Sequence, residues 1–231
     1  MTAGTVVTAP DGTQVTLAEI GQTVLLDNDA VRIWEVVLDA QEIQPWHLHH
    51  NPYVVLNLEA SAGRMDWLDG SAPRFLEEYV GGAVYRPTSP VHRLTNIGES
   101  RYRNRLVEFK DLGEKRGETI DIGPGKRSIP GMEPTTALPD GRCAVLDHEH
   151  VRVWTITVPS GAKANLELAD QPHVLAAITA PALDDDPSGA TRYHEGGQLT
   201  LENPTDAAAA WYVVELRYLP ELAVVGAAYA E

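Results

Sequence analysis

The sequence has few of the features that mark secreted, membrane-bound or nucleic-acid-binding proteins. Cys143 is its single cysteine, so no disulfide can form within the chain. Only 18 Lys and Arg stand against 33 Asp and Glu, a formal net charge of −15, whereas nucleic-acid or anionic-membrane partners need a basic face. No run approaches the roughly 20 apolar residues of a membrane span, and residues 1–9 lack the charged start and apolar core of a signal peptide. We therefore expect a cytoplasmic protein that binds neither nucleic acid nor membrane.

Long stretches with a helical period are also scarce. Residues 31–38 alternate between apolar and polar side chains and are rich in branched ones, which is typical of a half-buried strand. Residues 53–58 are expected to form the next long strand. Shorter strands are predicted at 65–68, 84–86, 91–95 and 101–109, with Gly- and Asn-containing turns between them. Short strands at this spacing predict a sandwich or a barrel.

A set of unlike residues recurs along the chain at a constant spacing. Seven positions are matched 120 residues later, namely Asp27, Val31, Arg32, Trp34, Leu48, Pro52 and Val54 by Asp147, Val151, Arg152, Trp154, Leu168, Pro172 and Val174. A shorter spacing pairs Asn96 with Asn203 and Val107-Glu108 with Val214-Glu215. This pattern predicts an internal duplication. The expected organisation is a first barrel over 1–112, a Gly- and Pro-rich linker over 113–140 and a second barrel over 141–231.

Three of the eight histidines fall within four positions, in the stretch from Gln44 to Tyr53. On a strand, His47 and His49 point to one face, so both rings can reach one cation at the 2.0–2.2 Å that such bonds need. His92, on a short apolar strand, completes a set of three if antiparallel strands bring it near. The alternative is a histidine cluster that is packed or solvated, and a lone histidine such as His92 is more often a hydrogen-bonded core residue.

These residues resemble the two signature blocks of the cupin superfamily. The first block has two histidines one residue apart and then a glutamate, whose place is taken here by Tyr53 or Val54. In the second block Ser89 replaces a glycine, and the remaining positions fit Gly81 or Gly82, Pro87, His92 and Asn96. The resemblance covers about residues 25–110 well and 145–218 weakly. It implies an all-β bicupin, two cupin-type antiparallel β-barrels (double-stranded β-helix or jelly roll) from the duplication, with one divalent metal held by His47, His49 and His92.

The second copy departs from that pattern. Glu167, Ala169, His173 and Leu199 stand where the first copy has His47, His49, Tyr53 and His92. Two residues of ligand type without a third make a poor metal site. We therefore expect the second barrel to be a degenerate, metal-free repeat with a structural role or a role in forming a homodimer.

A site of three neutral imidazoles leaves the full charge of the metal in place. It favours an anionic or chelating small molecule as substrate, and it resembles the sites of cupin dioxygenases. Fe(II) is the preferred metal, with Ni, Mn, Cu or Zn as alternatives, because imidazole suits them all. Tyr53 is the candidate catalytic residue, as a proton donor or base or a weak ligand, against the alternative of a packed ring. Arg103 and Arg105 are candidates for binding a substrate carboxylate, although a solvated face is the usual role of such arginines.

Three functions follow from these residues. The first is a dioxygenase, an oxidoreductase acting on a small acidic or enolisable molecule. The second is a lyase, isomerase or hydrolase that uses the metal as a Lewis acid, with Tyr53 moving the proton. The third is a non-catalytic small-molecule-binding or regulatory cupin. The sequence alone does not identify the substrate, because the residues lining the cavity depend on the barrel register.

Overall fold

A computed structural model describes residues 3–113, 120–179 and 191–219. The chain divides into two compact units between Pro134 and Thr135, within the predicted linker. Apart from a single 3₁₀ turn, η1 (Lys110–Leu112), the regular elements of the described residues are all strands. No helix in this part of the chain is long and apolar enough to cross a membrane.

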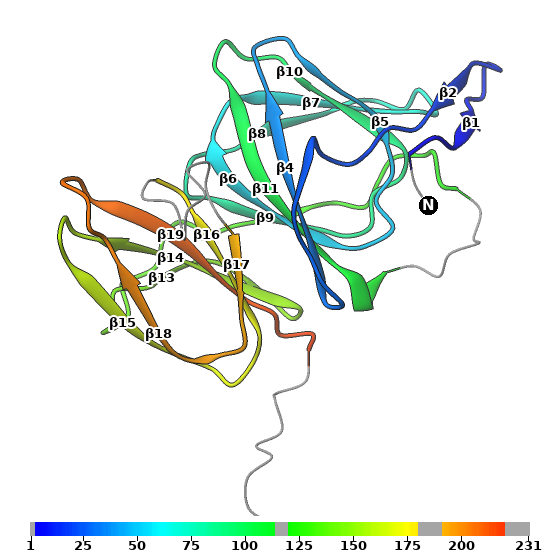
Figure 1. The fold of residues 1–231 in the computed structure, drawn as a ribbon. Coiled ribbons are helices and arrows are strands. Elements are labelled where there is room, and N and C mark those ends of the chain that lie inside the picture. Colours follow the sequence, from blue (N-terminus) through cyan, green and yellow to red (C-terminus); the bar gives the residue numbers. More distant parts are fainter. Residues whose placement is uncertain (1–2, 114–119, 180–190, 220–231) are drawn as a thin grey trace, which may run out of the picture. The chain divides into compact units, whose positions relative to one another are not determined.

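The first unit contains two antiparallel sheets and a hairpin (Figure 1). The smaller sheet has the strand order β5 (Ile43–His47), β10 (His92–Asn96), β7 (Ala62–Trp67), β8 (Arg74–Glu77). The larger sheet has the order β12 (Ile129–Pro130), β9 (Ala83–Arg86), β6 (Tyr53–Glu59), β11 (Tyr102–Phe109), β4 (Val31–Leu38), β3 (Thr23–Asp27). The hairpin consists of β1 (Val6–Thr8) and β2 (Gln14–Thr16). Residues 129–130, which fall in the predicted linker, thus add a short edge strand to the first unit.

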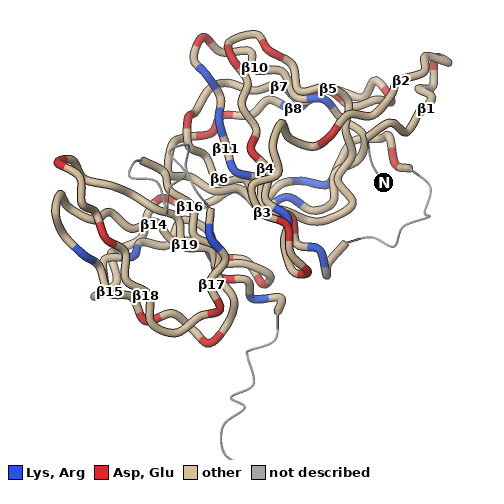
Figure 2. The backbone as a smooth tube through the Cα atoms, in the orientation of Figure 1, with Lys and Arg blue, Asp and Glu red and all other residues tan. Residues whose placement is uncertain are grey.

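Apolar side chains from both sheets form the core of the first unit. One cluster joins Val36 and Leu38 of β4 to Met65 and Trp67 of β7. Such a cluster requires the two sheets to face each other, with every second residue of each strand pointing inward. The polar side of the larger sheet is paired across strands, since Arg103 of β11 lies 2.7 Å from Glu35 of the neighbouring β4. Figure 2 shows basic positions along β11 beside an acidic position on β4.

The second unit repeats this topology. Its larger sheet has the order β13 (Cys143–His148), β14 (Val151–Val158), β19 (Ala209–Glu215), β16 (His173–Ala177), β17 (Thr191–His194). Its smaller sheet pairs β15 (Lys163–Leu168) with β18 (Gly197–Glu202). These orders match β3-β4-β11-β6-β9 and β5-β10 of the first unit strand for strand. The predicted duplication is therefore confirmed by the strand order.

The duplication extends to single side chains. Asn96 donates from Nδ2 to the carbonyl oxygens of Leu38, Asp39 and Ser100 at 3.0, 3.1 and 2.8 Å. Its counterpart Asn203 donates in the same way to three carbonyl oxygens, those of Val158, Pro159 and Ala207, at 2.9, 3.1 and 2.7 Å. Each asparagine therefore fixes the turn that follows β10 or β18 against the end of β4 or β14.

We expect Asn96→Ala to lower the free energy of unfolding of the first unit by about 2 kcal/mol, because buried carbonyl groups lose their donor. Asn203→Ala should have a similar effect on the second unit. Thermal and denaturant unfolding of both variants measures this. The control is Asn165→Ala, since Asn165 is exposed and accepts one bond from Thr200. A loss in Asn165→Ala as large as in Asn96→Ala would contradict the structural role.

Candidate metal centre

A β-bulge sets the position of the first histidine pair. Leu94 of β10 pairs with Gln44 of β5, and His92 of β10 pairs with His47 of β5. The step from Leu94 to His92 is two residues, whereas the step from Gln44 to His47 is three. The extra residue in β5 breaks the simple alternation, so that both Gln44 and His47 are buried. Bulges commonly redirect a side chain next to a functional site. Here the bulge places His47 and His92 opposite each other on neighbouring strands.

His49 completes the set just beyond the end of β5. Its backbone N–H donates to the carbonyl oxygen of Ser89 at 3.2 Å, which continues the pairing toward the segment before β10. The ring centroids of His47 and His92 are 4.3 Å apart, and His49 lies 5.2 and 5.4 Å from them. One ligand nitrogen from each ring lies within 4.8 Å of the other two, and all three residues are buried. The structure thus brings together the three residues that the sequence predicts as metal ligands.

Hydrogen bonds to the backbone fix the tautomer of two of the rings. His47 donates from Nδ1 to the carbonyl oxygen of Pro45, and His92 from Nδ1 to that of Pro90, both at 2.7 Å. A carbonyl oxygen only accepts, so the proton is on Nδ1 and the Nε2 lone pair is free. Nitrogens bound to one metal at about 2.0–2.2 Å lie at most about 4.4 Å apart. Small ring rotations therefore suffice to close the three residues on one divalent cation, and the donor set fits such a metal.

The third ring faces a buried carboxylate that the sequence pattern does not assign to the site. His49 Nδ1 lies 3.6 Å from Glu108 Oε1 on β11 and has no hydrogen-bond partner. The indole N–H of Trp34 donates to the other carboxylate oxygen of Glu108 at 2.8 Å. A carboxylate behind a metal-binding histidine is a common orienting partner. In the sequence, Glu108 was visible only as part of the repeated pair Val107-Glu108.

Burial keeps the three imidazoles neutral at physiological pH. Desolvation lowers the pKa of His47 to about 4, although the hydrogen bond to the Pro45 carbonyl acts to raise it. Desolvation, followed by the proximity of the other histidines, lowers the pKa values of His49 and His92 well below 6.5. Desolvation also raises the pKa of Glu108. A neutral imidazole is the form that binds a metal, so the site is ready for one without losing a proton.

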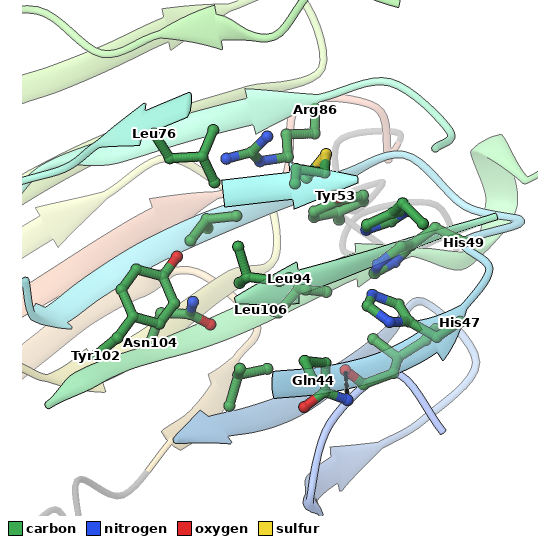
Figure 3. Close-up of a pocket in the computed structure, with 15 residues that line it drawn as sticks. Gln44, His47, His49, Tyr53, Leu76, Arg86, Leu94, Tyr102, Asn104 and Leu106 are labelled. Carbon is green, nitrogen blue, oxygen red and sulfur yellow. Dashed lines mark hydrogen bonds between the residues drawn. The ribbon is translucent and has the colours of Figure 1, made fainter. Parts of the chain in front are cut away.

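The three histidines line a small cavity between the two sheets (Figure 3). Its volume is about 30 Å³, enough for one or two water molecules. Most of the wall is apolar, including Val36, Val55, Met65, Leu94 and Leu106. Arg86 of β9 is the one lining residue with a permanent charge, and there is no carboxylate among the lining residues. A cation in this cavity would keep its full charge.

Tyr53 begins β6 and points into the same cavity, as the alternation with His47 and His49 predicts. Its ring stacks on that of His49, with centroids 4.0 Å apart and planes inclined by 18°. Its hydroxyl lies 3.1 Å from Ser89 Oγ. Desolvation raises the pKa of Tyr53, and the nearby Arg86 opposes that shift. The phenol therefore keeps its proton near neutral pH, which suits a hydrogen-bond donor better than a base.

The structure does not bring Arg103 and Arg105 to the cavity. Tyr102, Asn104 and Leu106 of β11 line it, so the odd-numbered residues of that strand point to the other face of the sheet. Both arginines form ion pairs with Glu35, at 2.7 and 2.9 Å. Arg86, which the sequence pattern does not single out, is the arginine that lines the cavity.

The second unit has an apolar interior where the first has its histidines. In β15 and β18 the pairing is regular, so Leu166 lies opposite Leu199 and Glu167 points outward and is exposed. His173, the counterpart of Tyr53, is fully buried and donates from Nδ1 to the Gln171 carbonyl at 2.6 Å. Within the described residues, a second group of potential ligands is found, His148, Glu149 and His150, in the turn between β13 and β14. That group is partly exposed.

Lowering the pH from 7 to 5 should destabilise the metal-free protein. The pKa of His47 is about 4 in the folded chain and about 6.5 when unfolded, so the unfolded chain takes up protons first and stability falls below pH 6.5. His47 alone accounts for about 2 kcal/mol over this range. Melting temperatures of the chelator-treated protein measure the effect, and His47→Gln should be less sensitive to acid. A melting temperature that is constant or rises between pH 7 and 5 would contradict the burial of neutral imidazoles.

Comparison with known proteins finds similarity in structure but not in sequence. No family model matches the chain, and no curated protein matches it in sequence. The structure of AerE from Microcystis aeruginosa is similar with a TM-score of 0.53, at 8% identity over 82% of this chain and 93% of that one. The protein YhaK from Escherichia coli gives a TM-score of 0.52, at 13% identity over 85% and 92% of the two chains.

A cupin domain from Bordetella pertussis Tohama I covers 38% of this chain and 90% of its own, at 23% identity and a TM-score of 0.35. Identities this low show the fold alone. The two whole-chain similarities extend across both units, and the facing antiparallel sheets recur in each unit. The chain therefore has an all-β fold of two repeated units, each built from antiparallel sheets.

Proposed function

We propose that the first unit binds one divalent metal through His47, His49 and His92 and acts as a non-haem Fe(II) dioxygenase on a small anionic, chelating molecule. The observation that carries this proposal is the convergence of three buried, neutral imidazoles on a cavity without a carboxylate. Fe(II) bound there would supply a Lewis-acidic, dipositive centre that can reduce dioxygen. The cavity neutralises none of that charge, so an enolate, diketonate or carboxylate is the ligand it favours.

Arg86 strengthens the preference for an anion. Its guanidinium lines the cavity and is 3% exposed, so a ligand at the metal would meet a cationic hydrogen-bond donor in a poorly solvated environment. The ion pair with Glu78 at 2.9 Å holds the guanidinium in place. Charge-assisted hydrogen bonds of this kind orient a carboxylate or an enolate oxygen. Arg86 therefore takes the place that the sequence pattern gave to Arg103 and Arg105.

Tyr53 supports oxidation more than proton abstraction. A Lewis-acid lyase or isomerase would need a base beside the substrate, and the raised pKa of Tyr53 makes its phenolate scarce near neutral pH. As a neutral phenol stacked on His49, Tyr53 can donate a hydrogen bond to a bound anion. The wall around the same space is mostly apolar, which disfavours water there. These features suit a site that protects a reactive oxidation from water.

Dioxygen consumption tests the proposed function. Protein loaded anaerobically with one equivalent of Fe(II) is mixed with pentane-2,4-dione, 3-mercaptopropionate or salicylate, which represent diketones, thiols and aromatic acids. We expect uptake of about one dioxygen per molecule of product with at least one of these classes. Zn(II)-loaded protein is the matched control, because Zn(II) offers the same charge without redox chemistry. Product formation by the Zn(II) form at the same rate, without dioxygen, would favour the Lewis-acid alternative and contradict oxidation.

We expect His92→Ala to abolish tight Fe(II) binding while the first unit stays folded. Two imidazoles remain, and the hydrogen bond of His92 to Pro90 is a minor part of the barrel. Metal per chain by elemental analysis and the melting temperature of the metal-free protein measure the two effects separately. His150→Ala is the matched control, because it removes a histidine from the turn between β13 and β14. Full metal content in His92→Ala, or loss of metal in His150→Ala, would place the metal elsewhere.

A further inference from the structure

A second pocket lies next to the metal cavity on the first unit. Its volume is about 360 Å³, against about 30 Å³ for the metal cavity, and it is formed by β8, β9 and residues 127–130. Leu76 and Arg86 line both pockets, and Figure 3 shows these two side chains at one side of the metal cavity, with Tyr53 between Arg86 and His49. This volume is within the range of small-molecule sites, whereas the volume of the metal cavity is below that range. We call the larger space the outer pocket.

Three arginines line the outer pocket, and they are not equally neutralised. Arg86 forms an ion pair with Glu78, whose other carboxylate oxygen accepts a hydrogen bond from Tyr102 at 2.7 Å. In contrast, neither Arg74 nor Arg127 forms an ion pair with a carboxylate of the described residues. This is unexpected in a chain with 33 acidic residues and 18 basic ones. The pocket therefore keeps positive charge that a ligand can use.

Arg74 is held in place by groups that leave its charge uncompensated. Its guanidinium lies over the ring of Trp67, 5.1 Å from the centroid, and donates to the Gly125 carbonyl oxygen at 2.8 Å. Burial, followed by the nearby Arg86, lowers the pKa of Arg74. Two guanidinium groups brought this close repel each other, which an anion between them would relieve. Packing on an aromatic ring also orients the guanidinium at little further entropic cost.

Ser128 marks the point where the two guanidinium groups converge. Its hydroxyl oxygen accepts a hydrogen bond from Nη1 of Arg86 at 3.1 Å and one from Nη1 of Arg74 at 3.4 Å. Two cationic donors that already converge on one hydroxyl oxygen can also donate charge-assisted hydrogen bonds to a carboxylate oxygen placed beside it. Glu77 also lines the pocket, but it is exposed and alternates with the inward-facing Leu76. A ligand carboxylate can reach the two arginines beside the serine hydroxyl.

We propose that the outer pocket binds the carboxylate of a small organic acid beside Ser128, through the unpaired guanidinium groups of Arg74 and Arg127 together with that of Arg86. That this acid is also the substrate rests on the proposed function, because the side chains of Leu76 and Arg86 separate the outer pocket from the metal cavity. The statement that the pocket binds a carboxylate does not depend on the metal. The ligand class is a dicarboxylate or keto acid, since one acidic group binds outside while the other end faces Leu76 and Arg86.

Equilibrium binding of succinate to the full chain tests this proposal. Titrations followed by nuclear magnetic resonance are made at fixed ionic strength on the chelator-treated protein and on the metal-loaded protein. We expect succinate to bind both forms with a dissociation constant in the low millimolar range or tighter, and neutral succinamide not to bind. Arg74→Met together with Arg127→Met should weaken succinate binding at least tenfold. Arg127→Met alone should weaken it at least threefold, and this variant keeps the packing of Arg74 on Trp67.

Arg64→Met is the matched control, because Arg64 is a partly exposed arginine on β7 that pairs with Asp66 at 2.7 Å, outside the outer pocket. Succinate binding equal to that of the unaltered chain is expected for it. The proposal is overturned if succinate does not bind, if Arg127→Met and the double variant bind it unchanged, or if inorganic phosphate binds the pocket more tightly than succinate. Binding that occurs only in the metal-loaded protein would also overturn it, since the anion would then be at the metal. The chelator-treated protein contains no metal, so its succinate binding tests the outer pocket even if the proposed metal binding at the histidines proves wrong.

Discussion

The pairing of β5 with β10 is the constraint on which the candidate site depends. One extra residue in β5 places His47 opposite His92 and also turns Gln44 inward. Backbone carbonyls two residues before each histidine, those of Pro45 and Pro90, then hold the two rings in the same tautomer. The local backbone thus leaves the Nε2 lone pairs of His47 and His92 free for a metal. The other strands of the barrel surround them with mostly apolar side chains.

The second unit shows what the same topology does without that constraint. Its strands β15 and β18 pair without an extra residue, and two leucines face each other where the first unit has histidines. Trp154, Leu166, Leu199 and Trp211 belong to one apolar cluster that fills the interior. The hydrogen bonds of Asn203 nevertheless repeat those of Asn96. The scaffold was therefore kept in both copies, while the chemistry of the interior differs.

Much of the fold and part of the site could be predicted from the sequence. The constant spacing of Trp34 and Trp154, and of their neighbours, predicted two equivalent units. Side-chain alternation correctly grouped His47 with His49 and with Tyr53, since all three line the cavity. The same spacing misled at Glu167, which aligns with His47 but points outward, since β15 has no bulge. A bulge of one residue cannot be recognised from the spacing of residues in the sequence, yet every residue beyond it points to the opposite face of the sheet.

Residues that act across strands were out of reach of the sequence. Glu108 reaches His49 from β11, and Arg86 reaches the cavity from β9, so both depend on register between distant segments. The sequence did not determine whether Arg103 and Arg105 point to the cavity or to the outer face of the sheet. The pairing of β11 puts them on the face away from the cavity. Strand order and register, rather than composition, decide which charged residues meet the site.

The central claim is that one divalent metal is held by three imidazoles in the first unit. X-ray absorption spectroscopy of the full chain loaded with one equivalent of Fe(II) tests it most directly. The account predicts nitrogen and oxygen neighbours at about 2.0–2.2 Å, the multiple-scattering pattern of three imidazole rings and no sulfur neighbour. A chain that retains no metal, or a metal whose neighbours include fewer than two imidazoles, would contradict it.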